Sequence, residues 1–320
     1  MLKALSAIVT LLAAQPVLAN SIVPPRPAPL QPAVAPPILN LGTDPFSRMT
    51  VPISLNGETH RFLIDSGSER TAIATELAGH HGMVPTGTVL VTGLAGKSWV
   101  PTVVVPSMGF ARSSRRNFQA LLFSRYAMGA DGFLGADMLA QQLVDFDFAN
   151  NRMTLRRAPS IPGPPSFDST LFLKARQHKG RLVFAYARAG RVPIRAVLDT
   201  GSSISIGNGA LRQALARRKR LGPTIPVTLI AVTGEPVQAE LAIAREVVIG
   251  DAIFRNLPIA FATVQPFVQL GYVEEPAMLV GMDALRAFDR VAVDFRNKRV
   301  SFTLKTSLGK PNLNIRGVAW

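Results

Sequence analysis

The sequence predicts an all-β protein built from two duplicated lobes, and three observations support this. The apolar segments are short, and 25 glycines and 25 prolines among 320 residues favour strands and turns over long helices. Five sequence landmarks occur twice in the same order. A proline cluster between the two copies is typical of a linker. Since 48% of the residues are hydrophobic and 17% are charged, we expect both copies to form packed cores.

The two copies are predicted to contain the same elements. Each opens with an alternating strand-like segment, at 50–55 and at 181–186, and a second strand then ends in an aspartate turn. A hairpin, a pair of apolar residues before a glycine, and two closing strands follow. We also expect short helices at 136–142 and 282–288 and a basic surface helix at 211–220. Duplication of one β-rich unit explains this order better than coincidence.

Six segments follow from these patterns. They are a signal peptide at 1–19, a proline-rich arm at 20–40, an N-terminal lobe at 41–157, a linker at 158–170, a C-terminal lobe at 171–306 and a tail at 307–320. The arm is favoured as an extended spacer over a pro-segment that covers a cleft.

The first nineteen residues have the pattern of a secretory signal. Lys3 precedes an apolar stretch at 4–14, and Val17-Leu18-Ala19 supplies small residues for cleavage; an uncleaved anchor is the less favoured alternative. The chain has no cysteine, which excludes disulfides and thiol chemistry. We therefore expect export to a bacterial periplasm or to the extracellular space.

The formal net charge is +15, and the basic residues are scattered apart from two local clusters at 112–116 and 217–220. An exported chain without a recognisable nucleic-acid motif is not expected to bind nucleic acid. A solvated basic face that contacts anionic envelope surfaces is the favoured interpretation.

The most informative feature is a pair of tripeptides. Asp65-Ser66-Gly67 follows the apolar run 62–64, and Asp199-Thr200-Gly201 follows the run 196–198. Each places a carboxylate at the end of a strand, followed by a hydroxyl residue and a glycine that permits a sharp turn. Two carboxylates that share one proton can activate a water molecule.

This arrangement resembles the aspartic proteases of the pepsin and retropepsin clan over nearly all of residues 45–305. The small halves without disulfides look closer to two fused retropepsin-like units than to pepsin. The resemblance implies a bilobal aspartic-protease fold with the active-site cleft between the lobes. It also implies an endopeptidase that cleaves polypeptide substrates as a monomer and needs no cofactor.

The same resemblance implies a role for each motif residue. Asp65 and Asp199 would form the catalytic dyad, and Ser66 and Thr200 would tie the turns together. Gly67 and Gly201 would let backbone amides approach the carboxylates. Loops at Gly135 and Gly281 would pack beneath the turns. The other aspartates of the repeat are expected at strand ends, turns and helix starts.

A flap hairpin over the cleft is also implied, and 89–101 is the best segment for it. Gly93 and Gly96 would lie at its tip, although an ordinary hairpin remains an alternative. Trp99 either touches substrate or packs in the lobe, and core packing is the favoured alternative. Pepsin-type enzymes carry a flap tyrosine, and this hairpin has none.

The four histidines, His60, His80, His81 and His178, do not have metal-ligand spacing, and adjacent His80 and His81 are expected to point apart. No metal is therefore predicted. Two alternatives to a protease remain: an inactive bilobal protein that binds peptide or envelope polymer, and a structural envelope protein that uses its basic face.

Overall fold

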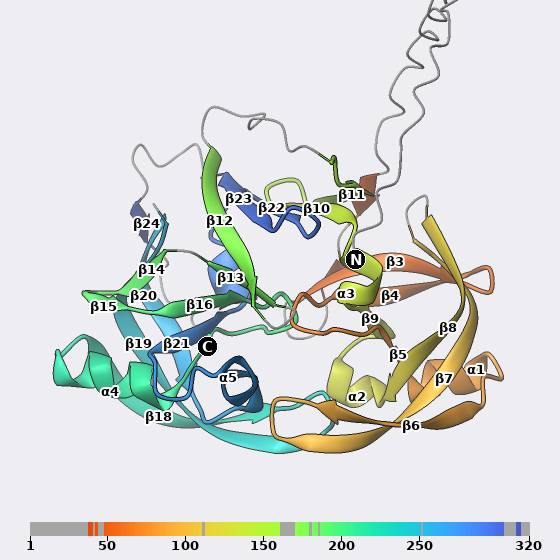
Figure 1. Ribbon diagram of the computed structural model, residues 1–320, viewed down its shortest axis with the longest axis horizontal. Helices are drawn as coiled ribbons and strands as arrows, with labels where there is room; N and C mark the ends of the chain where they lie inside the picture. The colour runs from red at the N-terminus through yellow and green to blue at the C-terminus, as the bar shows by residue number, and fades with distance from the viewer. Residues whose placement is uncertain are drawn as a thin grey trace, which may run out of the picture. The chain divides into compact units, whose positions relative to one another are not determined.

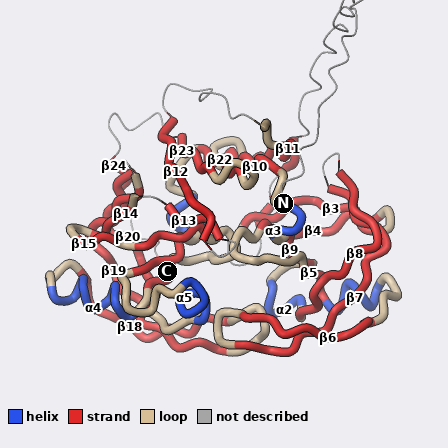
Figure 2. Tube along the Cα trace, viewed as in Figure 1, coloured by secondary structure: helices blue, strands red, loops and turns tan. Residues whose placement is uncertain are grey.

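The computed structural model describes residues 38–40, 42–43, 48–110, 113–160, 170–178, 181–184, 186–250, 252–303 and 312–314. These residues belong to one compact unit. The predicted signal peptide, most of the arm and most of the linker lie outside the described residues. Strands dominate, and the helices are short (Figures 1 and 2). No helix in the described part of the chain is long and apolar enough to cross a membrane.

The N-terminal lobe is an eight-stranded sheet in the order β2-β3-β4-β9-β5-β8-β7-β6, and an additional β3–β7 pairing folds it back on itself. Its strands are β2 (Gly42–Thr43), β3 (Met49–Leu55), β4 (Glu58–Ile64), β5 (Ala72–Ala74), β6 (Pro85–Thr92), β7 (Lys97–Phe110), β8 (Ser113–Phe123) and β9 (Gly132–Leu134). Its helices are α1 (Thr75–His80), α2 (Arg125–Met128) and α3 (Ala136–Leu139).

The C-terminal lobe belongs to a second sheet of sixteen strands. Its own strands are β12 (Thr170–His178), β13 (Arg181–Phe184), β14 (Ala187–Ala189), β15 (Val192–Pro193), β16 (Arg195–Leu198), β17 (Ile206–Gly207), β18 (Leu221–Ile230), β19 (Pro236–Ile249), β20 (Ala252–Phe261), β21 (Ala277–Val280), β22 (Arg290–Asp294), β23 (Arg299–Thr303) and β24 (Asn312–Asn314). Its helices are α4 (Gly209–Arg217), α5 (Gln265–Leu270) and α6 (Met282–Leu285).

The strand pairing repeats in both lobes. β4 pairs in parallel with β9, and β16 pairs in parallel with β21. β5 lies antiparallel to β9 and parallel to β8, just as β17 lies antiparallel to β21 and parallel to β20. Parallel pairing of strands that are distant in sequence is a demanding topology. Its double occurrence supports the duplication that the sequence predicts.

A shared sheet joins the lobes. β10 (Gln142–Asp147) pairs antiparallel with β22, with Val144 opposite Val293, and both side chains are fully buried. β11 (Arg152–Arg157) and β1 (Ile38–Asn40) extend this sheet on one side, and β23 and β12 extend it on the other (Figure 1). The last hairpin of the N-terminal half, β10–β11, therefore lies in the sheet of the C-terminal half. This pairing covers strand edges that would otherwise stay open.

The structure differs from the sequence-based predictions of local elements in three respects. The predicted helices at 136–142 and 282–288 end at Leu139 and Leu285, and in the first case Gln142 already begins β10. The basic helix runs from Gly209 to Arg217, because Asn208 Oδ1 caps it by accepting the Leu211 N–H at 2.9 Å. Residues 38–40 of the predicted arm and 312–314 of the predicted tail form strands that pair with β11 and β20.

Candidate active site

The two aspartate turns lie at equivalent places in the two lobes. Asp65 follows the last residue of β4, and its N–H donates to Leu134 O at 3.0 Å. Asp199 follows β16, and its N–H donates to Val280 O at the same distance. The three residues before each aspartate are buried, so the core anchors the strand whose end presents the carboxyl.

Reciprocal hydrogen bonds lock the turns together. The Ser66 N–H donates to Thr200 Oγ1 at 3.0 Å, and the Thr200 N–H donates to Ser66 Oγ at 3.0 Å. The hydroxyls then donate to strand carbonyls of the opposite lobe, Thr200 to Ile64 at 2.7 Å and Ser66 to Leu198 at 3.3 Å. Both hydroxyl residues are buried. The structure thus brings these two residues together across the lobe boundary.

Each carboxyl lies against the glycine of the opposite turn. A methyl group at Gly201 would stand 2.5 Å from the Asp65 carboxyl carbon, and one at Gly67 would stand 2.7 Å from Asp199 Oδ1. Each aspartate also accepts an N–H from its own turn, Asp65 from Gly67 at 2.8 Å and Asp199 from Gly201 at 3.2 Å. Only a residue without a side chain permits this approach.

Loops at Gly135 and Gly281 contact the turns from behind. The Ala136 N–H donates to Ser68 O and the Met282 N–H to Ser202 O, both at 2.9 Å. A methyl group at Gly135 would collide with the Arg70 backbone at 2.5 Å, and one at Gly281 would collide with the Ile204 backbone at 2.6 Å. Both glycines therefore allow backbone to pack directly on backbone.

A hydroxyl and an aspartate support each of these loops. Thr71 Oγ1 accepts the Gly135 N–H at 3.2 Å and donates to Asp137 at 2.8 Å. Ser205 Oγ accepts the Gly281 N–H at 3.2 Å and donates to Asp283 at 2.8 Å. Burial raises the pKa of Asp283 to about 6. Sequence reasoning placed these aspartates at helix starts but missed the two hydroxyls, whose only signal was their equal offset from each aspartate turn.

Burial governs the electrostatics of the facing carboxyls. It raises the pKa of Asp65 to about 6, and the neighbouring charge of Asp199 adds to the rise. Burial also raises the pKa of Asp199, while the Arg181 charge and the N–H groups of Gly201 and Ser202 oppose the rise. Both aspartates keep partial solvent exposure. One proton shared between the two is therefore the expected state at mildly acidic pH.

Two arginines beside the turns were missed by sequence reasoning. Arg181, at the start of β13, places Nη1 2.8 Å from where a methyl group at Gly67 would stand. Arg48 donates from Nη1 to Gly201 O at 3.3 Å and from Nη2 to Met128 O. Both cations lower the pKa of Asp65 and Asp199, against the effect of burial. Nothing in their sequence neighbourhood indicates this position.

Comparison with known proteins identifies the family. The family model described as aspartyl protease matches the chain twice, over residues 51–138 and 185–284, and each match contains one of the two aspartate turns. This chain belongs to the aspartyl protease family. No curated protein matches it.

This aspartyl protease family member has a long hairpin in each lobe. β6 and β7 enclose a tip at 93–96, and β18 and β19 enclose a tip at 231–235. The two hairpins meet, because Ser98 Oγ in β7 donates to Glu235 at the second tip at 3.0 Å. The first tip also contacts α5, whose Gln265 N–H donates to Leu94 O at 3.1 Å. Figure 1 shows the two hairpins converging from opposite lobes. The sequence suggested a flap only in the first lobe.

Trp99 does not pack in the core of this aspartyl protease. Its side chain is 70% exposed, and it lies opposite Leu90, which is also exposed. Val89 and Val91, on the other face of β6, pack against the hydrophobic core. Because side chains alternate along a strand, Trp99 lies on the outer face of the hairpin. The favoured expectation of core packing is therefore wrong.

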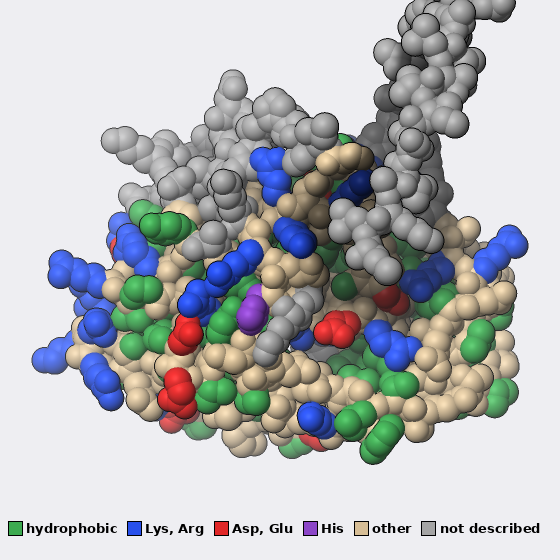
Figure 3. Space-filling view, viewed as in Figure 1, with side chains coloured by type: hydrophobic (Ala, Val, Ile, Leu, Met, Phe, Trp, Pro, Cys, Tyr) green, Lys and Arg blue, Asp and Glu red, His purple; other side chains and the backbone are tan. Residues whose placement is uncertain are grey.

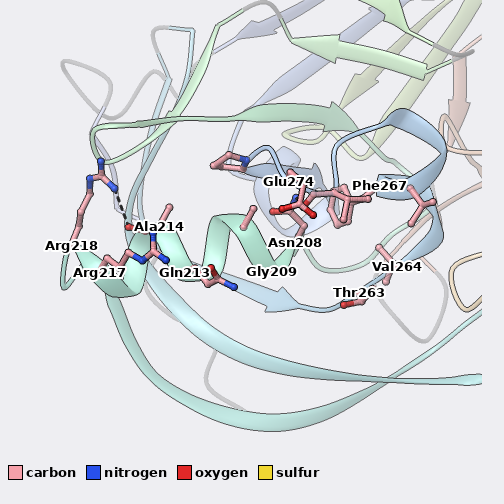
Figure 4. A pocket seen from close by; sticks show the side chains of 14 residues that line it. Asn208, Gly209, Gln213, Ala214, Arg217, Arg218, Thr263, Val264, Phe267 and Glu274 are labelled. Carbon is pink, nitrogen blue, oxygen red and sulfur yellow. Dashed lines mark hydrogen bonds between the residues drawn. The ribbon is translucent and has the colours of Figure 1, made fainter.

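A cavity of about 400 Å³ lies elsewhere in the C-terminal lobe, between α4 and the loop before α5 (Figure 4). Asn208, Arg217 and Glu274 are among its lining residues, and neither Asp65 nor Asp199 is.

Lys and Arg side chains are distributed over the face of the molecule in Figure 3, in keeping with the net charge of +15.

Proposed function

We propose that this chain is an aspartic endopeptidase in which Asp65 and Asp199 together activate water. The observation that carries the proposal is the mutual packing of each carboxyl on the opposing glycine, which places both acids at one partly exposed spot. Membership of the aspartyl protease family supports the same activity. Ser66 and Thr200 act as positioning residues because their hydrogen bonds hold the two turns in register.

The proposed reaction uses one proton on the pair. The ionised carboxylate takes a proton from water, whose oxygen attacks the peptide carbonyl carbon. The protonated carboxyl gives its proton to the carbonyl oxygen, which yields a neutral tetrahedral diol. A proton then moves from the diol through the carboxylates to the amide nitrogen. The carbon–nitrogen bond breaks, and the products are an acid and an amine.

The two hairpins favour an extended polypeptide as substrate. Among the described strands β6 pairs only with β7 and β18 only with β19, so an extended peptide can pair with either as an added strand. Gly93 and Gly96 at the first tip permit close approach of a peptide backbone. The enzyme would act as a monomer, since one chain supplies both halves of the site. Export to the periplasm or the extracellular space and contact with anionic envelope surfaces belong to the same proposal.

The test is cleavage of a mixed peptide library by the purified chain, with and without pepstatin. Asp65→Asn and Asp199→Asn, made separately, should each lower kcat/KM by about 10²–10⁴-fold. Asp147→Asn, a matched change in a turn where Asp147 accepts from Asn150, should leave it unchanged. Full activity in either dyad variant would reject the paired mechanism. Saturable peptide binding without cleavage would instead identify an inactive binding protein.

A further inference from the structure

Three of the four histidines gather at one spot of the N-terminal lobe. The expectation that His80 and His81 point apart is wrong, since their ring centroids are 5.0 Å apart. His60 lies in β4, and His80 and His81 end α1 and begin the following turn. The His60 and His81 Nε2 atoms are 3.1 Å apart although 21 positions separate the residues. Glu58, two residues before His60 on the same face of β4, joins them.

The three donor atoms are spaced as zinc ligands are. One ligand atom each from Glu58, His60 and His81 lies within 4.8 Å of both others. Zinc bonds of about 2.0–2.1 Å in a tetrahedral arrangement separate neighbouring ligand atoms by about 3.3 Å. The observed 3.1 Å between the imidazoles and 3.8 Å between Glu58 Oε2 and His60 Nε2 bracket that value. The Glu58 side chain is 57% exposed, so solvent-facing space is open to small rotations of its carboxylate.

A fixed carboxylate lies near His60, where metal-binding imidazoles usually have a hydrogen-bond acceptor, although at 4.0 Å the two groups are not hydrogen-bonded. Asp131 Oδ2 lies 4.0 Å from His60 Nδ1, the ring nitrogen that faces away from His81. The Arg61 N–H and the Arg125 guanidinium each bond Asp131 at 2.9 Å and hold it in place. His80 bonds Glu58 at 3.3 Å and orients that carboxylate from the other side. His60 itself is only 13% exposed.

We propose that Glu58, His60 and His81 bind one Zn²⁺, with the fourth position open to water. Two imidazoles and a carboxylate suit zinc better than magnesium or calcium, which prefer oxygen ligands. The site would clamp β4 to the end of α1 and so stabilise the N-terminal lobe. It is independent of the proposed peptidase activity, because none of its residues belongs to the aspartate turns.

Zn²⁺ alone is the probe, and the protein is the full chain without a histidine tag. Equilibrium dialysis with metal analysis should find one Zn²⁺ per chain. Excess Zn²⁺ at about 100 times Kd should raise Tm by about 5 °C, and Mg²⁺ should not. His81→Gln and Glu58→Gln should each weaken zinc binding at least about tenfold. Glu58 is exposed and His81 is partly exposed, and glutamine is close in size to both, so neither change should prevent folding.

His178→Gln is the matched control. His178 lies in β12 and bonds Leu270 O at 2.9 Å, so its loss removes a histidine but no proposed ligand. Zinc binding with wild-type affinity in this variant supports the site. The proposal is overturned if the wild type shows no saturable binding up to about 100 µM Zn²⁺, or if His81→Gln binds as tightly as the wild type.

Discussion

Ser66 and Thr200 accept each other's backbone N–H at 3.0 Å, although 134 positions separate them. Each hydroxyl also donates to a buried strand carbonyl of the opposite lobe, so neither can be removed without leaving polar groups unpaired. This exchange fixes how the two aspartate turns face each other. At this point the lobe boundary is held by buried, fully paired hydrogen bonds, as the interior of a domain is.

Loss of one of these hydroxyls should lower both the free energy of unfolding and the peptidase activity. Thr200→Val keeps the side-chain shape but leaves the Ser66 N–H and the Ile64 carbonyl without this partner, at a cost of about 2–4 kcal/mol. Urea unfolding measures the cost, and peptide cleavage measures the loss of activity. Thr200→Ser, which restores the hydroxyl, should recover most of both. Equal stability of the valine variant and the wild type would contradict the structural role.

A methyl group on the turn should disable the site while the fold remains. Gly201→Ala would place its Cβ 2.5 Å from the Asp65 carboxyl, which must then move out of line. We expect kcat to fall by about 100-fold or more, since small misplacements of reacting groups are costly. Gly209→Ala, at a glycine with open space around it, is the control and should keep full activity. Near-normal kcat for Gly201→Ala would show that Asp65 is not at the reacting centre.

The pH profile should follow the raised pKa values of the dyad. With the pKa of Asp65 at about 6, the shared proton is lost as pH rises through that value, and kcat/KM should fall on that alkaline limb. Burial and Asp199 raise this pKa, whereas Arg181 and Arg48 lower it. Removing one arginine therefore moves the limb to higher pH.

The variant Arg181→Met tests the direction in which the alkaline limb moves. Its kcat/KM profile, normalised to its own maximum, should shift upward and give a several-fold higher relative activity near pH 7. Arg191→Met removes the same charge from an exposed turn and should leave the profile in place. A downward or absent shift in Arg181→Met would show that the guanidinium does not act on the carboxyls.

An ion pair with a buried carboxylate should hold the lobes together. Arg290 in β22 bonds both oxygens of Asp145 in β10, through Nε at 2.5 Å and through Nη2, and the Asp145 side chain is 10% exposed. Asp145→Ala removes both of these charge-assisted bonds and should cost about 1.5–3 kcal/mol in denaturant unfolding. Breaking the exposed Arg195–Glu275 pair by Glu275→Ala should cost less than about 1 kcal/mol. Similar costs for the two changes would refute the role assigned to burial.

Much of the fold was predictable because its signals are local. Short apolar runs ending at Asp65 and Asp199 predict buried strands, and their repetition predicts two lobes of one topology. Helix ends were less predictable. The run after Gly135 is made of good helix formers, yet the helix ends at Leu139 because pairing with β22 draws the chain into β10. Tertiary pairing overrides helix propensity there.

The residues around the aspartates were predictable only where the repeat marks them. The motif predicted the turns. Arg48 and Arg181 lie just before β3 and at the start of β13, and in the sequence they look like any solvated basic residue. For Trp99, packing in the core was the favoured of two alternatives, yet strand alternation puts it on the outer face. His60 and His81 have no meaningful spacing along the chain, and only the packing of α1 beside β4 joins them.

By itself, the order of amino acids determined the strands, the duplication and the identity of the two acids, because apolar periodicity and glycine turns act over a few neighbouring positions. Only the folded chain decided which groups surround those acids, how far the lobes share a sheet and where the imidazoles meet. Such contacts join positions tens to hundreds of residues apart, and their free energy depends on burial and charge that exist only after the lobes have packed.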